Sequence, residues 1–276
     1  MSVFAPAANQ PVISYDNVRI GFDEGEVLRG VSLEVAEGET KVLVGETGTG
    51  KTLLLKMAAG LIKPNAGRVT VLGQDVTAMT EKELLDFRRQ LGVVFQEGAL
   101  FDSLSVRENV AFRLMEEKVD EAEIEDRVRE ALRFVEMEHA IDQFPGELSG
   151  GMRRRVSIAR ALISHPPIVL YDSPTAGLDP VTAQTIITLI LRLRDLFGVT
   201  ALLATHRIQD AFALSNFRFD AQSERVVPMS SNGAGAGAQP QRLTTFLVLK
   251  DGEVYFTGDQ HAVLDSHDPY LKRFLL

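Results

Sequence analysis

The sequence contains no cysteine. This absence excludes disulfide bonds, thiolate metal sites and cysteine nucleophiles together, and it fits a reducing compartment. Basic residues are not in excess either, because the formal net charge is −9 at pH 7. An overall negative field repels nucleic acids and acidic membrane surfaces. We therefore expect no nucleic-acid partner, and any anionic ligand has to be held by local geometry.

Long uninterrupted apolar runs are also missing. The most apolar window, IITLILRLRDLFGVTALLAT, contains Arg192, Arg194 and Asp195. Charges at these positions favour a helix followed by a strand over a membrane span. The N-terminus, MSVFAPAANQPVISYD, lacks the basic and apolar regions of a secretory signal. We expect a soluble chain that reaches a membrane only through a partner.

The first part of the chain has a β-rich pattern. Residues 1–11 are polar and rich in alanine and proline, and we expect them to be disordered, with one domain over 12–276. Short β-rich runs between 12 and 44 end in TKVLV, which is apolar enough for a central strand. A helix at about 50–60 and a strand at RVTVLG follow.

A helical and acidic pattern covers residues from about 97 to 165. In DEAEIEDRVREALRFVE, apolar residues recur at spacings of three and four and give one apolar face, with Asp120 as a suitable N-cap (Ile124, Val128, Ala131 and Val135). The pattern predicts a helical lobe inserted into an α/β core.

The core pattern then resumes with the strand PIVLYD. A helix from about 180 to 197 begins with Pro180 and ends at Gly198, and the strand VTALLAT follows it. Strands that alternate with helices predict a parallel sheet covered on both faces, and hence an α/β fold. The low-complexity segment 230–241 is expected to be a flexible loop between the strands RVVPM and TTFLVL.

The strongest local motif is GETGTGKT, which matches G-x-x-x-x-G-K-[ST] between an expected strand and an expected helix (Gly45, Glu46, Thr47, Gly48, Thr49, Gly50, Lys51 and Thr52). Its glycines let successive backbone N–H groups point at phosphate oxygens, and the helix N-terminus adds positive potential. Lys51 would reach the β- and γ-phosphates, and the Thr52 hydroxyl would ligate Mg²⁺. The alternative, a chance glycine-rich loop, is disfavoured by both flanking elements.

Asp172 ends the apolar run of the strand PIVLYD. A carboxylate at the end of a buried strand beside the phosphate loop would hold Mg²⁺, usually through water. On its own such an aspartate is equally typical of a cap or a turn. Together with the phosphate loop it predicts a site for ATP and Mg²⁺.

Further motifs carry a resemblance to a known family. LSGGM at 148–152, the following RRRVSIARAL and AGLD at 176–179 resemble the motifs of ATP-binding cassette (ABC) proteins, in the usual order. The resemblance covers about residues 12 to 275. It implies a P-loop NTPase core with a β-rich subdomain and an inserted helical lobe.

The resemblance also implies roles for individual residues. Phe22 would stack on adenine, Gln96 would meet Mg²⁺ and the attacking water, and His206 would contact the γ-phosphate. The signature residues would reach ATP bound to a second copy of the chain in a head-to-tail dimer (Ser149, Gly150 and Gly151). The candidate catalytic residues are then Lys51, Gln96, Asp172, Ser173 and His206.

Each role has a structural alternative. Phe22 is equally well explained as part of the core, and Asp179 as a helix cap. His206 could be a strand-end histidine, although its place after LLAT favours the functional role. Arg153 and Arg154 are expected on a solvated helix face, whereas Arg155 matches a position that is usually basic in the family.

A narrower resemblance concerns the segment FQEGALFDSLSVRENVAF, the methionine of LSGGM and the ending DPYLKRFL. These are similar to the ATPases of MCE-domain (Mla-type) transporters, which power lipid movement. They imply integral-membrane permease subunits, an MCE-domain substrate-binding protein and a position on the cytoplasmic face of the inner membrane. The surface from Gln96 to Ser105 would dock a permease helix.

Ser173 departs from the family pattern, in which a glutamate normally follows the aspartate. Serine can hydrogen-bond a water molecule but cannot accept its proton near neutral pH. General-base assistance contributes about 10²–10⁴ in rate, although phosphoryl transfer depends mostly on positioning and charge neutralisation. We expect ATP binding and dimer closure to persist and hydrolysis to be slow, unless His206 substitutes as the base.

Three functional hypotheses therefore stand. The first is the ATPase subunit of a lipid transporter, or of an importer for another substrate. The second is a nucleotide-gated dimerisation module with little hydrolysis. The third is a DNA-repair or ribosome-associated ABC protein, which the acidic balance disfavours.

Overall fold

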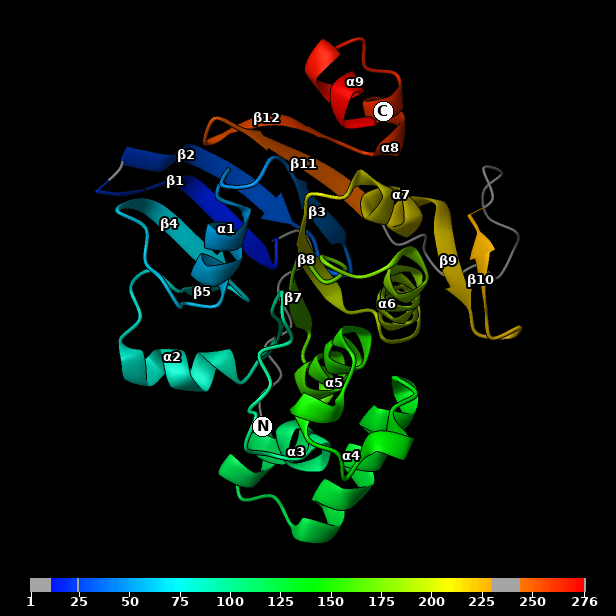
Figure 1. Cartoon of the computed structure of the whole chain (residues 1–276). Helices are drawn as coiled ribbons and strands as arrows, with labels where there is room; N and C mark the ends of the chain where they lie inside the picture. Colours follow the sequence, from blue (N-terminus) through cyan, green and yellow to red (C-terminus); the bar gives the residue numbers. More distant parts are fainter. Residues whose placement is uncertain (1–10, 24, 230–243, 276) are drawn as a thin grey trace.

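The computed structural model describes residues 11–23, 25–229 and 244–275. The flexible loop expected at 230–241 lies outside these residues, as does the expected disordered N-terminus except for Pro11. Two large sheets and a group of helices make up the described chain (Figure 1). Within the described ranges, no helix combines the length and the apolarity needed to cross a lipid bilayer.

A six-stranded sheet forms the centre of the molecule. Its strand order is β12-β11-β3-β8-β7-β6, and all neighbours are parallel except β12 (Glu253–Gly258), which is antiparallel to β11. The parallel strands are β11 (Thr244–Lys250), β3 (Thr40–Val44), β8 (Thr200–Thr205), β7 (Ile168–Asp172) and β6 (Leu91–Val94). Strands β3 and β8 are buried along their whole length. Such continuous apolar runs are typical of parallel strands covered on both faces, and the expected parallel sheet is confirmed.

Successive residues of the central strands pack into two different apolar cores. Leu43, Leu170 and Leu202 belong to one core, whereas Val42 and Val169 belong to the other. The alternation follows from the two-residue period of a strand. Each face of the sheet therefore holds its own layer of side chains.

An antiparallel sheet and helix α1 cover the first face. The sheet has the order β2-β1-β4-β5, with β2 (Gly25–Val35), β1 (Ile13–Phe22), β4 (Ala66–Val71) and β5 (Gln74–Asp75). Helix α1 (Lys51–Ala58) lies between this sheet and the central one, to the left in Figure 1. Helix α2 (Glu81–Arg88) closes this part of the core through Leu84 and Phe87.

Helices cover the second face. In the lower part of Figure 1 lie α3 (Val106–Glu116), α4 (Glu121–Phe134) and α5 (Gly150–Leu162), with two short 3₁₀ turns between α4 and α5 at Glu138–Ala140 and Pro145–Glu147. Ser105 begins α3 with a capping box, and Asp120 caps α4 as the sequence predicted. Their apolar faces join the central strands in one core.

Helix α6 (Pro180–Arg192) continues as a π-helical turn, Leu193–Phe197, and ends at Gly198 with φ 70°. This confirms the helix predicted over 180–197. Helix α7 (Ile208–Asn216) and the hairpin of β9 (Phe217–Asp220) and β10 (Arg225–Pro228) follow β8. Helices α8 (Gln260–Leu264) and α9 (Pro269–Leu275) end the chain at the top of Figure 1.

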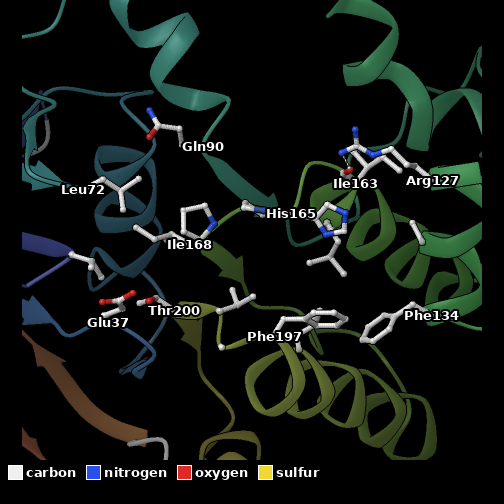
Figure 2. Close-up of a pocket in the computed structure, with 18 of the residues that line it drawn as sticks. Glu37, Leu72, Gln90, Arg127, Phe134, Ile163, His165, Ile168, Phe197 and Thr200 are labelled. Atoms are coloured by element: carbon white, nitrogen blue, oxygen red, sulfur yellow. Dashed lines mark hydrogen bonds between the residues drawn. The ribbon is translucent and has the colours of Figure 1, made fainter. Parts of the chain in front are cut away.

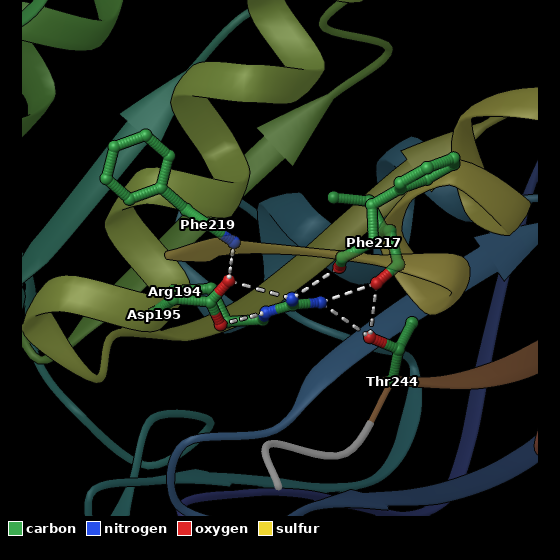
Figure 3. A network of polar contacts seen from close by, with 6 residues as sticks. Arg194, Asp195, Phe217, Phe219 and Thr244 are labelled. Carbon is green, nitrogen blue, oxygen red and sulfur yellow. Dashed lines mark hydrogen bonds and ion pairs between the residues drawn. The ribbon is translucent and has the colours of Figure 1, made fainter. Parts of the chain in front are cut away.

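A buried arginine ties the hairpin to the core (Figure 3). Arg194 is 1% exposed and pairs with Asp195, with 2.7 Å between Nε and Oδ1. Its other nitrogens donate to the carbonyls of Leu214 and Phe217, and Asp195 accepts the Phe219 N–H. The charged pair is thus satisfied within the protein, as burial of a charge requires.

Candidate functional site

The predicted site residues follow the carboxyl ends of the parallel strands. The phosphate loop follows β3, Asp172 ends β7, Gln96 comes two residues after β6, and His206 follows β8. The registers pair Val44 with Thr205 and Asp172 with Ala204. Carboxyl ends of parallel strands share one edge of the sheet, which is the usual ligand-binding edge of α/β folds.

The phosphate loop has the backbone that its glycines permit. Gly48 and Gly50 have φ values of 87° and 96°, which side-chain-bearing residues rarely adopt. A Cβ on Gly45 would lie 2.7 Å from the carbonyl oxygen of Leu249. Glu46 and Thr47 are exposed, and the Thr49 hydroxyl donates to the Glu46 carbonyl at 2.9 Å. Gly50 is the N-cap of α1 and has no side chain to block the helix N-terminus.

Lys51 is 8% exposed and folds back onto the phosphate loop. Its ammonium donates to the carbonyls of Gly45 and Glu46 at 2.8 and 2.7 Å. Burial lowers the pKa of Lys51, and the nearby Asp172 charge opposes that shift. These carbonyls keep the ammonium at the loop, where a phosphate could replace them as the acceptor.

The structure brings Thr52, Asp172 and Ser173 together, although 120 residues separate the first two. The Thr52 hydroxyl donates to Asp172 Oδ1 at 3.1 Å, and the Ser173 hydroxyl lies 3.4 Å from the same oxygen. One carboxylate and one hydroxyl are the hard oxygen ligands that suit Mg²⁺, which keeps several waters and phosphate oxygens. Among the described residues, no group of three or more His, Cys, Asp or Glu forms a separate metal cage.

Ser173 has an unusual backbone. Its φ of 46° lies in the left-handed region, and its N–H donates to the carbonyl of Ala204 at 2.8 Å. The backbone bond to β8 fixes the turn after Asp172 and keeps the serine side chain half-buried at the strand end.

Other predicted residues lie at the surface. Phe22 is 54% exposed at the end of β1, which makes its core alternative wrong. Gln96 and His206 are exposed as well. Asp179 caps α6, because its Oδ1 accepts the N–H groups of Val181 and Thr182 at 3.0 Å.

Ser149 is the N-cap of α5, and its hydroxyl accepts the Met152 N–H at 3.2 Å. Ser149 and Gly150 are exposed, whereas Gly151 is buried against α6. A Cβ at Gly151 would lie 2.3 Å from Thr182 Cγ2, so only glycine lets the two helices approach this closely. The N-terminus of α5 therefore faces outward, with Ser149 and Gly150 accessible at the surface.

The solvated helix face predicted for Arg153 and Arg154 is wrong. Arg154 is 5% exposed and donates to the carbonyls of Phe95 and Ala176. Arg153 is half-buried and donates to the Leu148 carbonyl at 2.6 Å. Backbone carbonyls of neighbouring loops accept the hydrogen bonds that water would accept from an exposed guanidinium. The helical pattern of the sequence gives no sign of these loops.

Asp210 on α7 also escaped the sequence reasoning. It is 4% exposed and accepts hydrogen bonds from the hydroxyls of Thr175 and Thr205. Burial raises its pKa. Helical spacing after His206 gives no signal for these contacts, because the partners come from the end of β8 and from the turn after Ser173.

A large pocket in the described part of the chain lies elsewhere (Figure 2). Its volume is about 1310 Å³, and it is lined near the amino ends of β7 and β8, with Ile168, Thr200, Phe134 and Phe197 on its wall. None of the predicted site residues lines it. The site described above lies instead along the carboxyl ends of the parallel strands, at the phosphate loop and the segments that begin at Gln96, Asp172 and His206; we call this edge the rim.

Comparison with known proteins adds a family match. The family model described as "ABC transporter" matches residues 28–176. The probable ribonucleotide transport ATP-binding protein Mkl of Mycobacterium leprae is 41% identical over 191 residues, which cover 69% of this chain and 55% of Mkl. The methionine import ATP-binding protein MetN of Brucella abortus is 37% identical over 203 residues, covering 74% and 55%. The chain thus spans about half the length of these relatives.

A solved structure has the same fold. The dimeric, post-hydrolysis ATP-binding cassette MJ0796, bound to ADP and Pi, superposes with a TM-score of 0.74 at 30% identity. The match covers 90% of this chain and 98% of the cassette. The expected P-loop NTPase cassette fold is therefore confirmed.

Proposed function

Because the chain belongs to the ABC transporter family, whose cassettes are ATPases, we propose that it is the ATP-binding and ATP-hydrolysing subunit of a transporter. One observation carries the proposal: the Thr52 hydroxyl and Asp172 meet at 3.1 Å beside the buried Lys51 ammonium. A polyphosphate needs this combination of a cation, backbone donors and a magnesium ligand set. It explains how a chain of net charge −9 holds an anion.

The residues of the rim divide the chemistry among them. Lys51 would exchange its carbonyl partners for phosphate oxygens, while Thr52 and Asp172 hold Mg²⁺, whose charge would offset that developing on the phosphates. Gln96 and Ser173 would orient the attacking water, and His206 would contact the γ-phosphate. Phe22, exposed at the end of β1, would stack on adenine.

A second copy of the chain would complete the site. The exposed N-terminus of α5 presents Ser149 and Gly150 outward, away from the chain's own contacts. An N-terminal helix end with a serine hydroxyl favours binding of an anion. Its acceptor would be the γ-phosphate on the partner copy, as in a head-to-tail dimer, and the dimeric cassette MJ0796 supports this arrangement.

An exposed aromatic pair supports docking of a permease. Phe101 and Phe112 are 43% and 39% exposed, with ring centroids 4.7 Å apart. Asn109, fully buried, donates to the carbonyls of Phe101, Leu104 and Ser105 and accepts the Phe101 N–H. The loop is thereby held rigid with apolar rings outside, as a docking surface for a helix requires. The chain would thus sit on the cytoplasmic face of the membrane.

The cargo we propose is lipid, with an MCE-domain protein as a further partner. This assignment rests on the resemblance of FQEGALFDSLSVRENVAF and LSGGM to MCE-type ATPases. The names of Mkl and MetN refer instead to ribonucleotide and methionine transport. An importer for another substrate is therefore the competing assignment.

Ser173 favours a second candidate, a dimerisation module. In this candidate ATP binding closes the dimer, and hydrolysis is too slow to contribute much to its opening. The two candidates differ in what transport needs. If a non-hydrolysable ATP analogue sustains the activity of the membrane complex, the second candidate holds; if only ATP does, the first holds.

The test begins with ATP binding by the purified chain with Mg²⁺. Wild type should bind, and Lys51→Ala should lose most of its affinity, because the loop then lacks its cation; full affinity in the variant would refute the site. Next, the chain is co-expressed with candidate permeases and lipid uptake is measured in vesicles. Phe101→Glu should reduce co-purification while ATP binding stays intact.

A further inference from the structure

Arg154 is a buried cation that the assigned chemistry leaves unused. It lies on α5, five residues after Ser149, and is 5% exposed. No carboxylate pairs with it in the described chain, and its Nε has no hydrogen-bond partner there. Burying a guanidinium that no carboxylate contacts directly is costly, so the position of Arg154 calls for an explanation.

The fork of Arg154 joins two loops of the rim. Nη1 donates to the carbonyl of Phe95 at 2.8 Å, and Nη2 donates to that of Ala176 at 3.3 Å. Phe95 directly precedes Gln96, and Ala176 lies three residues after Ser173. One side chain on the helix of Ser149 therefore contacts both segments that carry the water-orienting residues.

The same turn is held from its other side by α7 and β8. The Thr175 hydroxyl donates to Asp210, and Arg207 Nη1 lies 3.4 Å from the Thr175 carbonyl. Asp210 also accepts from Thr205, which directly precedes His206. Residues 175–176 are thus held by contacts on two sides. Arg154 of α5 contacts Ala176 on one side, and Asp210 of α7 contacts Thr175 on the other.

We propose that Arg154 is a positioning residue that locks the Gln96 loop and the turn after Ser173 to the N-terminal half of α5. The proposal rests on the proposed function, because it assigns a geometric role in ATP hydrolysis. When the helix moves with a second copy of the chain, both loops move with it. The state of the dimer then sets the placement of the attacking water.

The geometry requires an arginine. A planar guanidinium presents two nitrogens in a fixed fork, whereas a lysine ammonium is one point on a flexible stem. Burial lowers the pKa of Arg154, while Glu97 and Asp172 favour its charged form. The cation therefore also contributes positive potential near the metal ligand Asp172.

The experiment compares amide hydrogen exchange in wild type, Arg154→Gln and Arg154→Lys. A matched control is Arg127→Gln, since Arg127 donates to the Ile163 carbonyl at 2.7 Å from α4 and contacts no rim loop. We expect faster exchange at 95–99 and 173–178 in Arg154→Gln, unchanged exchange at 45–52, and neither change in the control. Unchanged exchange at both loops, or equal changes in the control, would overturn the proposal.

Steady-state kinetics supplies a second readout. Losing hydrogen bonds from a charged group should lower kcat about 10-fold or more with KM nearly unchanged, because the loops do not hold the nucleotide. Arg154→Lys should recover part of kcat, and it serves as the test variant if the glutamine variant does not fold. If instead KM rises by the same factor by which kcat falls, Arg154 has only a structural role and the proposal is overturned.

The two claims fail separately. If wild type neither binds nor hydrolyses ATP, the proposed function fails, and hydrogen exchange still decides whether Arg154 locks the loops. If wild type hydrolyses ATP and Arg154→Gln keeps full kcat with protected loops, only the role of Arg154 is refuted.

Discussion

Ser173 combines a fixed backbone with a replaceable side chain. Its N–H is bound to Ala204 on β8, and its φ of 46° belongs to the turn. A larger side chain would therefore project from the same backbone. We therefore expect a substitution of Ser173 to change the side chain next to Asp172 while leaving the backbone of the turn unchanged.

We expect Ser173→Glu to accelerate ATP hydrolysis by about 10²–10⁴ at neutral pH, because a carboxylate can accept the proton of the attacking water. Phosphate release under single-turnover conditions measures this. Ser173→Gln is the control, since it matches the size without the base and should stay slow. If wild type already turns over as fast as the glutamate variant, Ser173 is not a deficiency.

Asp210 gives a prediction about pH. Burial raises its pKa in the folded chain above the ordinary value of 3.8, so the unfolded chain loses this proton first as pH rises. Wild type should lose stability relative to Asp210→Asn between about pH 4 and the raised pKa. Above that pKa the difference should be constant. Urea unfolding of both proteins from pH 4 to 8 measures this difference. A wild type that gains stability relative to Asp210→Asn as the pH rises would contradict the sign.

The sequence could predict the phosphate loop and Asp172, because glycine spacing and strand-end position are local signals. It also predicted Asp120 as a helix cap. It could not predict the burial of Arg154 or Asp210, since their partners come from loops far apart in the chain. From the sequence alone an arginine on a helix is expected to face solvent. Only the folded chain shows that two loops cover Arg154 and accept its hydrogen bonds.

At the scale of elements, the network of Arg194 explains how α6 holds the β9–β10 hairpin. The π-helical turn places Arg194 and Asp195 so that they reach the carbonyls of Leu214 and Phe217. Sequence predicted the helix over 180–197 and both flanking strands. It missed several short elements, among them α2, β6, α7, β9 and β12, as well as the π-helical geometry, because short segments and helix ends carry little periodic signal.

Arg194→Met should lower the free energy of unfolding by about 3–5 kcal/mol, because Asp195 and two carbonyls lose their buried partner. The control is Arg218→Met, whose ion pair with Asp220 lies at the surface with 53% of the arginine side chain exposed. That change should have little effect. Urea unfolding measures both, and equal stability of the two variants would argue against a structural role for Arg194.

At the scale of the molecule, we expect Mg·ATP to convert single chains into dimers. Gly150→Arg should prevent this, since its side chain would enter the surface presented to the partner. Its Cβ would meet only Leu178 Cδ2 at 3.7 Å, so folding should persist. Gly146→Arg adds the same charge at an open position. Sedimentation velocity with and without Mg·ATP separates the cases; dimers of Gly150→Arg would reject the head-to-tail arrangement.

The two apolar layers of the central sheet have a last consequence. Alternate residues of one strand, such as Val42 and Leu43, are rooted in opposite layers. Sliding a strand by a single residue would exchange the contents of both layers at once. A strand therefore cannot shift along its axis by a small step. The site residues at the carboxyl ends of the strands are thus held in position along the strand axis by the core packing alone.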